Sequence, residues 1–147
     1  MTKGEKLRSG CPVSLGLDIF GDRWTLLIIR DLMFTGKQHF REMLQSEEGI
    51  SSNILADRLQ LLLAEGIITK AEDPGHRQKV VYSLTEKGID LLPILMQISH
   101  WSYKYRPVGE AYLGVPEAGN QEDQSDWGER KAVLQRQHLP SPGQEQT

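Results

Sequence analysis

The segment from Gly49 to Gly66 (GISSNILADRLQLLLAEG) constrains the fold more than any other part of the 147-residue chain. Leu55, Leu59 and Leu62 recur at the spacing of one helical face, which predicts an amphipathic helix with one buried side. Serines at its start and a glycine at its end are typical helix boundaries. Its opposite side carries small or amide-bearing residues instead of long charged side chains. That side either faces water or contacts a partner.

Three helices are predicted before this segment. The first spans about residues 12–20, with Pro12 at the first helical position. Asp22 is expected to cap a second helix that runs to about residue 34, and a short third helix turns the apolar residues of 40–44 inward.

Two β-prone runs follow, at residues 67–72 and 79–84. They flank residues 73–77, whose Asp-Pro-Gly sequence is typical of a turn, so a hairpin with a basic tip is predicted. The chain then continues as one long helix, from Glu86 to about Tyr105.

This order of elements is that of a winged helix-turn-helix. The predicted fold class is therefore mainly α with a small β-hairpin. Because a two-stranded hairpin is marginally stable alone, it must lean on the helices.

The composition changes near Arg106 and Pro107, which divides the chain into a domain of residues 1–106 and a tail of residues 107–147. The tail is rich in Pro, Gly, Gln and Glu, so it is predicted to be largely disordered, with a short helix at 126–139. It holds seven of the 20 acidic and three of the 17 basic residues. The net charge of −3 thus arises in the tail, and the domain itself carries 14 basic and 13 acidic residues. This charge balance neither requires nor excludes binding to nucleic acid.

Several functions are disfavoured by what the sequence lacks. With one cysteine, Cys11, it can form neither an internal disulfide nor a cysteine-based zinc site. The four histidines show no metal-ligand spacing and no glycine-rich phosphate loop is present, so we expect no enzyme, no metal and no cofactor. No run approaches 18 apolar residues and no apolar signal segment begins the chain. We therefore expect a cytoplasmic protein that does not bind membranes.

The polar side of the 49–66 helix suits the major groove of DNA. Short side chains let a helix axis approach, and Asn and Gln amides pair with adenine. Arg58 lies off this sector and fits a phosphate better than a base, and basic groups of the hairpin tip and third helix are expected to contact the backbone. The candidate DNA-binding residues are Ser51, Ser52, Asn53, Ala56, Asp57, Arg58, Gln60, His76, Arg77, Lys79, Lys37, His39 and Arg41.

The same features also fit an ordinary solvated surface. Asp57 favours that interpretation, because DNA repels a carboxylate unless it accepts a hydrogen bond from cytosine. The alternative function is a winged helix used for protein–protein contact without specific DNA binding. Such a module needs neither a short polar helix face nor a basic wing, and salt-dependent binding to a DNA duplex separates the two functions.

Several motifs resemble those of the HxlR-type bacterial winged-helix transcriptional regulators. They are CPV at 11–13, GDRWTLLI at 21–28, HFREM at 39–43, GIS at 49–51, EGII at 65–68 and VYSLT at 81–85. The resemblance covers about residues 10–105 and says nothing of residues 107–147. It implies a sequence-specific regulator that binds a roughly palindromic operator as a homodimer. Family dimer contacts come from the N-terminal and C-terminal helices.

The last predicted helix carries an apolar stripe that agrees with dimerisation. Its members are Leu92, Leu95, Ile98, Trp101 and Tyr105. They exceed what a body of this size can cover, so a partner helix is expected. The alternative is that the stripe closes the core of a single chain.

Some members of the resembling family sense electrophiles, aldehydes or oxidants through a cysteine at the position of Cys11. The thiol directly precedes Pro12 and so lies at a helix N-terminus, where the partial positive charge favours the thiolate. Cys11 is therefore the candidate sensor, and a small electrophile or oxidant is the candidate effector. The alternative is a small buried cap residue with an inert thiol.

Overall fold

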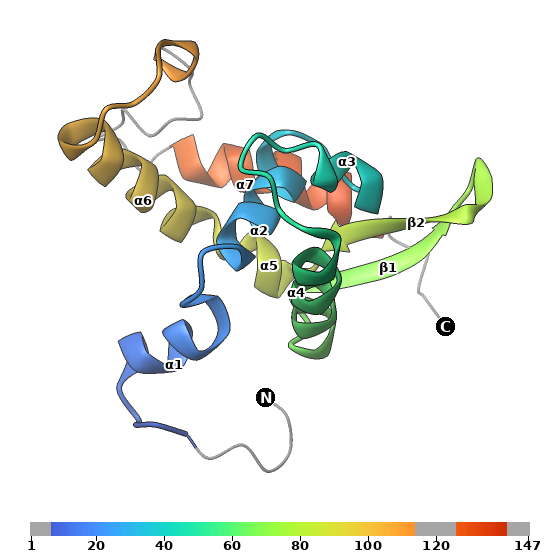
Figure 1. Ribbon diagram of the computed structural model, residues 1–147, viewed down its shortest axis with the longest axis horizontal. Coiled ribbons are helices and arrows are strands. Elements are labelled where there is room, and N and C mark those ends of the chain that lie inside the picture. Colours follow the sequence, from blue (N-terminus) through green and yellow to red (C-terminus); the bar gives the residue numbers. More distant parts are fainter. Residues whose placement is uncertain (1–6, 114–125, 141–147) are drawn as a thin grey trace. The chain divides into compact units, whose positions relative to one another are not determined.

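The computed structural model describes residues 7–113 and 126–140. The chain forms two compact units, residues 1–85 and 86–147. The described residues of the first form four helices and a hairpin: α1 (Pro12–Phe20), α2 (Thr25–Phe34), α3 (Phe40–Leu44), α4 (Ser52–Ala64), β1 (Ile68–Asp73) and β2 (His76–Leu84) (Figure 1). The second contains α5 (Glu86–Ile89), α6 (Leu92–Tyr105), the 3-10 turn η1 (Glu110–Tyr112) and α7 (Asp126–His138). In the described residues no helix has the length and apolar character needed to cross a bilayer.

The core of the first unit is built from α2, α3, α4 and the base of the hairpin. Leu55, Leu59 and Leu62 of α4 are at most 1% exposed, which confirms the predicted buried face of this helix. Each such side chain contributes about 1.5–3 kcal/mol to folding when it is removed from water. The other elements add the buried residues Ile28, Ile29, Leu32, Met33, Met43, Ile67, Ile68 and Leu84.

Both ends of α4 are fixed by local hydrogen bonds. The Ser51 hydroxyl accepts a hydrogen bond of 3.2 Å from a backbone N–H of the first turn. At the other end Gly66 has φ +70°, a left-handed conformation that glycine adopts without strain. The N–H groups of Gly66 and Ile67 donate to the carbonyls of Leu63 and Leu62, a pattern that terminates helices.

The start of α2 is held by Asp22. Its carboxylate accepts the backbone N–H groups of Trp24 (2.9 Å) and Thr25 (3.0 Å) and the Thr25 hydroxyl (2.5 Å). The sequence predicted Asp22 as the cap; the helix begins at Thr25, and Asp22 orders the turn before it.

The hairpin is longer than predicted and its turn is tighter. β1 and β2 pair antiparallel from Ile68 with Leu84 to Glu72 with Val80, and again from Asp73 to His76. The tip is therefore Pro74 and Gly75, and residues 76 and 77, predicted in the turn, belong to β2. Figure 1 shows the hairpin reaching away from α2 and α4.

The linker between α2 and α3 covers one edge of the hairpin. The backbone N–H of Tyr82 donates to the Gln38 carbonyl (2.8 Å), and the Gln38 amide donates to the Tyr82 carbonyl (3.1 Å). These bonds satisfy backbone groups of β2 that would otherwise lie at an open sheet edge.

The single long helix predicted from Glu86 to Tyr105 is wrong. α5 ends at Ile89, and α6 begins at Leu92 with Pro93 in its first turn. Proline has no backbone N–H and its ring collides with the carbonyl four residues earlier, which here belongs to Ile89. Apolar residues continue at helical spacing on both sides of this break, so their pattern did not reveal it.

Residues 126–138 form α7, where the sequence predicted a short helix at 126–139. The helix packs on α5 and α6, and Leu134 is 5% exposed. Lys131 pairs with Asp90 (3.1 Å), and Gln135 donates to Glu86 (3.3 Å). Of the predicted disordered tail, residues 114–125 and 141–147 lie outside the described residues.

Candidate nucleic-acid interface

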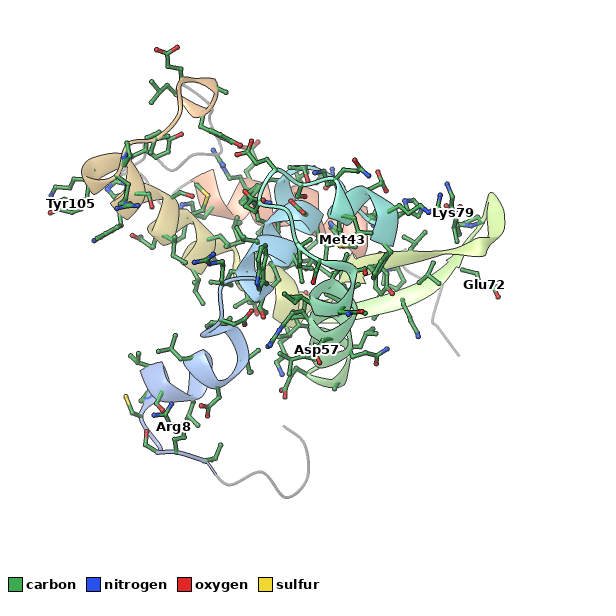
Figure 2. All side chains as sticks on the ribbon, in the orientation of Figure 1. Arg8, Met43, Asp57, Glu72, Lys79 and Tyr105 are labelled. Atoms are coloured by element: carbon green, nitrogen blue, oxygen red, sulfur yellow. The ribbon has the colours of Figure 1, made fainter. Side chains whose placement is uncertain are left out.

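The outward side of α4 is formed by the residues predicted to read DNA bases. Every one of them is exposed: Ser51, Ser52, Asn53, Ala56, Asp57 and Gln60. The side chain of Asp57 is 71% exposed, and Figure 2 shows it on α4. Because buried leucines hold the inner side of α4 against the core, its outer side presents small and polar side chains to solvent.

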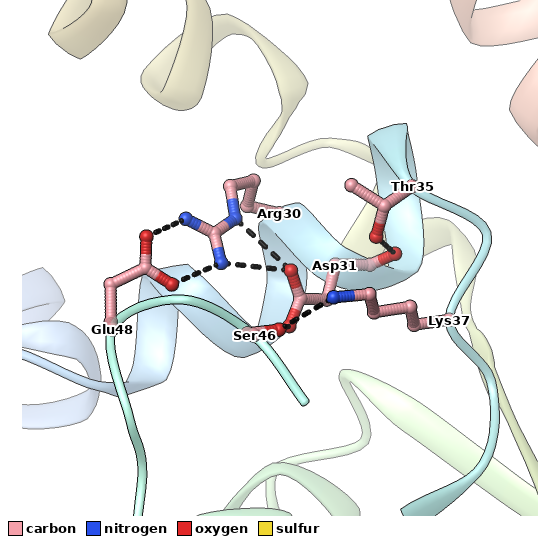
Figure 3. Close-up of polar contacts among 6 residues, drawn as sticks. All are labelled: Arg30, Asp31, Thr35, Lys37, Ser46 and Glu48. Carbon is pink, nitrogen blue, oxygen red and sulfur yellow. Dashed lines mark hydrogen bonds and ion pairs between the residues drawn. The ribbon is translucent and has the colours of Figure 1, made fainter. Parts of the chain in front are cut away.

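A buried polar network supports the turn that precedes α4 (Figure 3). We call Arg30, Asp31, Lys37, Ser46 and Glu48 the Asp31 network. Asp31, which is 3% exposed, accepts hydrogen bonds from the Arg30 guanidinium (2.8 and 3.1 Å) and the Ser46 hydroxyl (2.5 Å). Arg30 also donates two bonds to Glu48 (2.7 and 2.8 Å), and this guanidinium lowers the pKa of that carboxyl. The network ties α2 to both ends of the turn between α3 and α4.

Lys37 belongs to this network. Its ammonium group donates to the Ser46 hydroxyl at 2.9 Å (Figure 3). The phosphate contact predicted for Lys37 therefore competes with an internal hydrogen bond, because the lysine lies half-buried against the turn rather than at the end of an extended side chain.

His39 is likewise engaged within the protein. Its Nδ1 contacts the Glu42 carboxylate, its Nε2 lies 2.9 Å from Asp73 Oδ2, and its backbone N–H donates to Glu42 (3.2 Å). Hydrogen bonds to Asp73 and Glu42 raise the pKa of His39. The phosphate contact of His39 stays a prediction. In the structure the ring contacts two carboxylates, which the sequence did not suggest because Asp73 is 34 positions away.

Arg58 lies beside Asp22 rather than free on the α4 surface. Its Nε is 3.7 Å from Asp22 and 3.4 Å from Asp57, and it is buried without a hydrogen-bond partner. Burial of Asp22 acts to raise its pKa, but hydrogen bonds from Thr25 and Trp24 and the Arg58 charge together lower it. The phosphate contact of Arg58 stays a prediction, and in the structure its half-buried guanidinium lies near two carboxylates.

Two predicted cations remain on the surface. Arg41 on α3 and Lys79 on β2 are exposed, and Figure 2 shows Lys79 on the hairpin. The side chains of His76 and Arg77 lie outside the described part of the chain, so their predicted roles stay predictions.

The predicted dimer stripe on α6 is only partly exposed. Leu92 and Leu95 are 2% and 8% exposed, so they are core residues of the chain itself. Ile98, Trp101 and Tyr105 are 48–62% exposed, and the Trp101 and Tyr105 rings lie tilted to one another at 46° with centroids 5.3 Å apart. The exposed apolar stripe of α6 therefore lies on the helix face that contains Ile98, whereas Leu92 and Leu95 lie on the buried face.

Sequence reasoning missed two apolar residues at this surface. Ile94 is 37% exposed, four residues before Ile98, and its helical spacing could have revealed it. Trp127 of α7 lines an open apolar groove beside α6 together with Pro93, Ile94, Gln97, Ile98 and Trp101. No local signal places Trp127 there, because α6 and α7 are separated in sequence.

Cys11 is exposed at the N-cap of α1. The backbone N–H groups of Ser14 and Val13 lower the pKa of its thiol, although the thiol makes no capping hydrogen bond of normal geometry. In the single chain Cys11 is therefore exposed, and its role as a sensor stays a prediction.

Comparison with known proteins agrees with this arrangement. The HxlR-like helix-turn-helix family matches residues 19–110, so α7 lies beyond the matched region. The HTH-type transcriptional regulator YybR of Bacillus subtilis is 35% identical over 105 residues, which are 71% of this chain and 83% of YybR.

Two solved regulators are also similar to this chain. The reduced form of the B. subtilis regulator YodB is 30% identical with a TM-score of 0.55, covering 69% of this chain and 100% of YodB. YodB is also known in diamide-treated and quinone-bound forms. The oxidised form of the redox regulator HypR is 35% identical with a TM-score of 0.58, covering 67% of this chain and 100% of HypR.

These matches concern transcriptional regulators and not enzymes, and helix-turn-helix regulators act on DNA. The helices, the hairpin and the matched residues lead to one assignment. The chain belongs to the HxlR-like helix-turn-helix family of transcriptional regulators.

Proposed function

We propose that the protein binds a roughly palindromic DNA operator as a homodimer, with α4 in the major groove and the β1–β2 hairpin against the backbone. The observation that carries the proposal is the α4 surface, where six short residues are exposed opposite three fully buried leucines. Two-fold symmetry would place half-sites about 10–11 base pairs apart, or a multiple of that spacing.

Asn53 and Gln60 are the proposed base readers. Both are exposed on α4, and their amides can each donate to and accept from the edge of an adenine. Asn53→Ala should cost about 1–3 kcal/mol on the preferred operator and much less on random DNA. Equal losses on both DNAs, measured by fluorescence anisotropy, would refute base reading by Asn53.

Lys79 and Arg41 are the proposed backbone ligands among the described side chains, and Arg77 is proposed with them from sequence. The salt dependence of affinity tests this role, because each phosphate contact releases counterions. Lys79→Ala should reduce the slope of log affinity against log salt by about one unit per protomer on every sequence. Lys104→Ala, an exposed lysine of α6, is the matched control and should leave the slope unchanged.

The second candidate function is a winged-helix module for protein–protein contact. The exposed apolar groove beside α6 favours it, since such surfaces bind protein partners. Duplex selection from a random pool at low salt separates the two functions: a regulator enriches a palindromic motif, whereas an interaction module enriches none.

The exposed stripe of α6 supports the proposed homodimer. Ile94, Ile98, Trp101 and Tyr105 follow one another at helical spacing and are 37–62% exposed. Trp101→Glu should therefore shift the protein toward monomer in sedimentation experiments and weaken operator binding. A monomeric wild type that still binds a palindrome with full affinity would contradict this part of the proposal.

Cys11 is proposed to couple DNA affinity to electrophiles or oxidants. It is exposed with a lowered pKa, and the similar regulators YodB and HypR are known in distinct redox forms. As the one cysteine of the chain it can form a disulfide only with a second molecule. Diamide should change operator affinity in wild type and not in Cys11→Ser. Unchanged affinity in wild type whose thiol is shown by mass spectrometry to be modified would identify Cys11 as structural.

A further inference from the structure

His39 lies between two carboxylates that come from different elements. Glu42, in the first turn of α3, contacts Nδ1, and Asp73, at the end of β1, lies 2.9 Å from Nε2. The three side chains are 23–48% exposed, so water screens them only in part.

The geometry defines the protonation state of the ring. A neutral imidazole has one N–H donor and one acceptor nitrogen, and an acceptor nitrogen facing a carboxylate is repelled. Only the imidazolium donates from both nitrogens at once. Both contacts can therefore exist together only when His39 carries a proton on each nitrogen.

The contact with Asp73 joins the helix-turn-helix to the outer end of the hairpin. The base of β2 is already attached to the α2–α3 linker through Gln38 and Tyr82. His39 adds a second attachment near the tip, where Asp73 also accepts the Gly75 N–H (2.8 Å) and orders the turn. Two attachments fix the direction of a hairpin, whereas one leaves it free to pivot.

We propose that His39 is a positioning residue of the DNA-binding surface: its imidazolium clamps the wing to α3 through Asp73, and loss of a proton releases the wing. The proposal rests on the proposed function, since it assumes that the hairpin contacts DNA. It assigns to His39 an indirect role through Asp73 in place of a direct phosphate contact.

The direction of the pH dependence follows from the charges that face the ring. Glu42 from α3 and Asp73 from β1 favour the protonated ring, and the charge of Lys79 on β2 acts on Asp73. Because the folded pKa of His39 is raised above its ordinary 6.5, the clamp is complete below pH 6.5. It is lost as pH rises through the folded pKa, so operator affinity should fall at alkaline pH.

The test measures operator affinity and the His39 titration between pH 6 and 9. Wild type should lose about three- to tenfold in affinity over this range, as expected for partly exposed charged contacts. His39→Gln should bind like alkaline wild type with little pH dependence, and His39→Arg, which keeps a permanent charge and several donors, should retain affinity at high pH. His100→Gln, which changes an exposed histidine of α6 outside the proposed DNA-binding surface, is the matched control and should keep the pH dependence of wild type.

Histidine NMR gives a readout that is independent of DNA. The signal absent from His39→Gln belongs to His39, and its pKa should fall in Asp73→Asn, whose remaining side-chain oxygen can still accept the Gly75 N–H. An unchanged His39 pKa in Asp73→Asn, or equal pH dependence in wild type and His39→Gln, would overturn the clamp. Failure of all variants and of wild type to bind any duplex would instead overturn the proposed function, while the NMR result would still decide whether the clamp exists.

Discussion

Replacement of Asp31 by alanine tests whether the Asp31 network holds the helix-turn-helix together. Asp31 is 3% exposed and accepts two bonds from Arg30 and one from Ser46. The change removes the shared acceptor and leaves Arg30 with Glu48 and Ser46 with Lys37. Thr35, which donates to the backbone carbonyl of residue 31, keeps its bond.

The magnitude follows from the partners that remain. Breaking a buried ion pair by removing one member costs about 3–5 kcal/mol. The Arg30 side chain is 27% exposed and retains two hydrogen bonds to Glu48, so its charge still has a carboxylate partner. We therefore expect Asp31→Ala to lower the free energy of unfolding by about 2–3 kcal/mol, less than the full penalty.

Urea unfolding followed by circular dichroism measures this loss. With a slope of about 1–3 kcal/mol per molar urea, the midpoint should fall by about 0.7–3 M. Asp57→Ala, whose side chain is 71% exposed, is the matched control and should stay within about 0.5 kcal/mol of wild type. Amide exchange over residues 42–64 should rise in Asp31→Ala only. If both variants unfold at the same urea concentration, the network does not stabilise the turn and the reasoning fails.

Two further predictions concern the ends of helices. Asp22→Ala should cost about 1–2 kcal/mol of unfolding free energy at neutral pH. Because the folded pKa of Asp22 is lowered, this difference from wild type should disappear as pH falls through that pKa. A constant difference in urea titrations down to pH 2 would contradict the prediction. Gly66→Ala, at φ +70°, should cost about 1–2 kcal/mol of unfolding free energy in thermal melts, because the backbone is strained although open space surrounds the position. Gly128→Ala in α7 is the control, since this glycine also lies in open space but has no positive φ, and the change should be neutral or stabilising.

The helices and the hairpin were predictable because their signals are local. The leucines of α4 repeat within three turns, and the boundaries at Ser51 and Gly66 lie directly beside them. The break between α5 and α6 was missed although Pro93 marks it. In that region apolar residues continue at helical spacing on both sides, and spacing alone cannot show that a carbonyl and a proline ring collide.

The contacts of side chains were not predictable, because they join residues far apart in sequence. His39 meets Asp73 and Arg30 meets Glu48 only after the helices pack. The burial of Leu92 and Leu95 has the same origin, since spacing places a residue on a face but does not say what covers that face. The outward face of α4 is the exception, because its buried side identifies the exposed one.

Three of the basic residues predicted to contact DNA have contacts with polar groups of the protein itself. Sequence reasoning treated each basic residue near α4 as a phosphate ligand. In the structure Lys37, His39 and Arg58 lie beside hydroxyl or carboxylate groups of the protein, where a half-buried cation is stabilised more than at a screened surface.

We therefore expect these three residues to position the turn, the wing and α4, and to release few counterions if DNA binds. If Arg41, Arg77 and Lys79 are the remaining ligands, a dimer neutralises about six phosphates and the salt slope should be near −5, compared with about −11 if all six cations of each protomer took part. A slope near the larger value would mean that the internal contacts of Lys37, His39 and Arg58 open on binding, and that DNA, not the fold alone, sets the geometry of this surface.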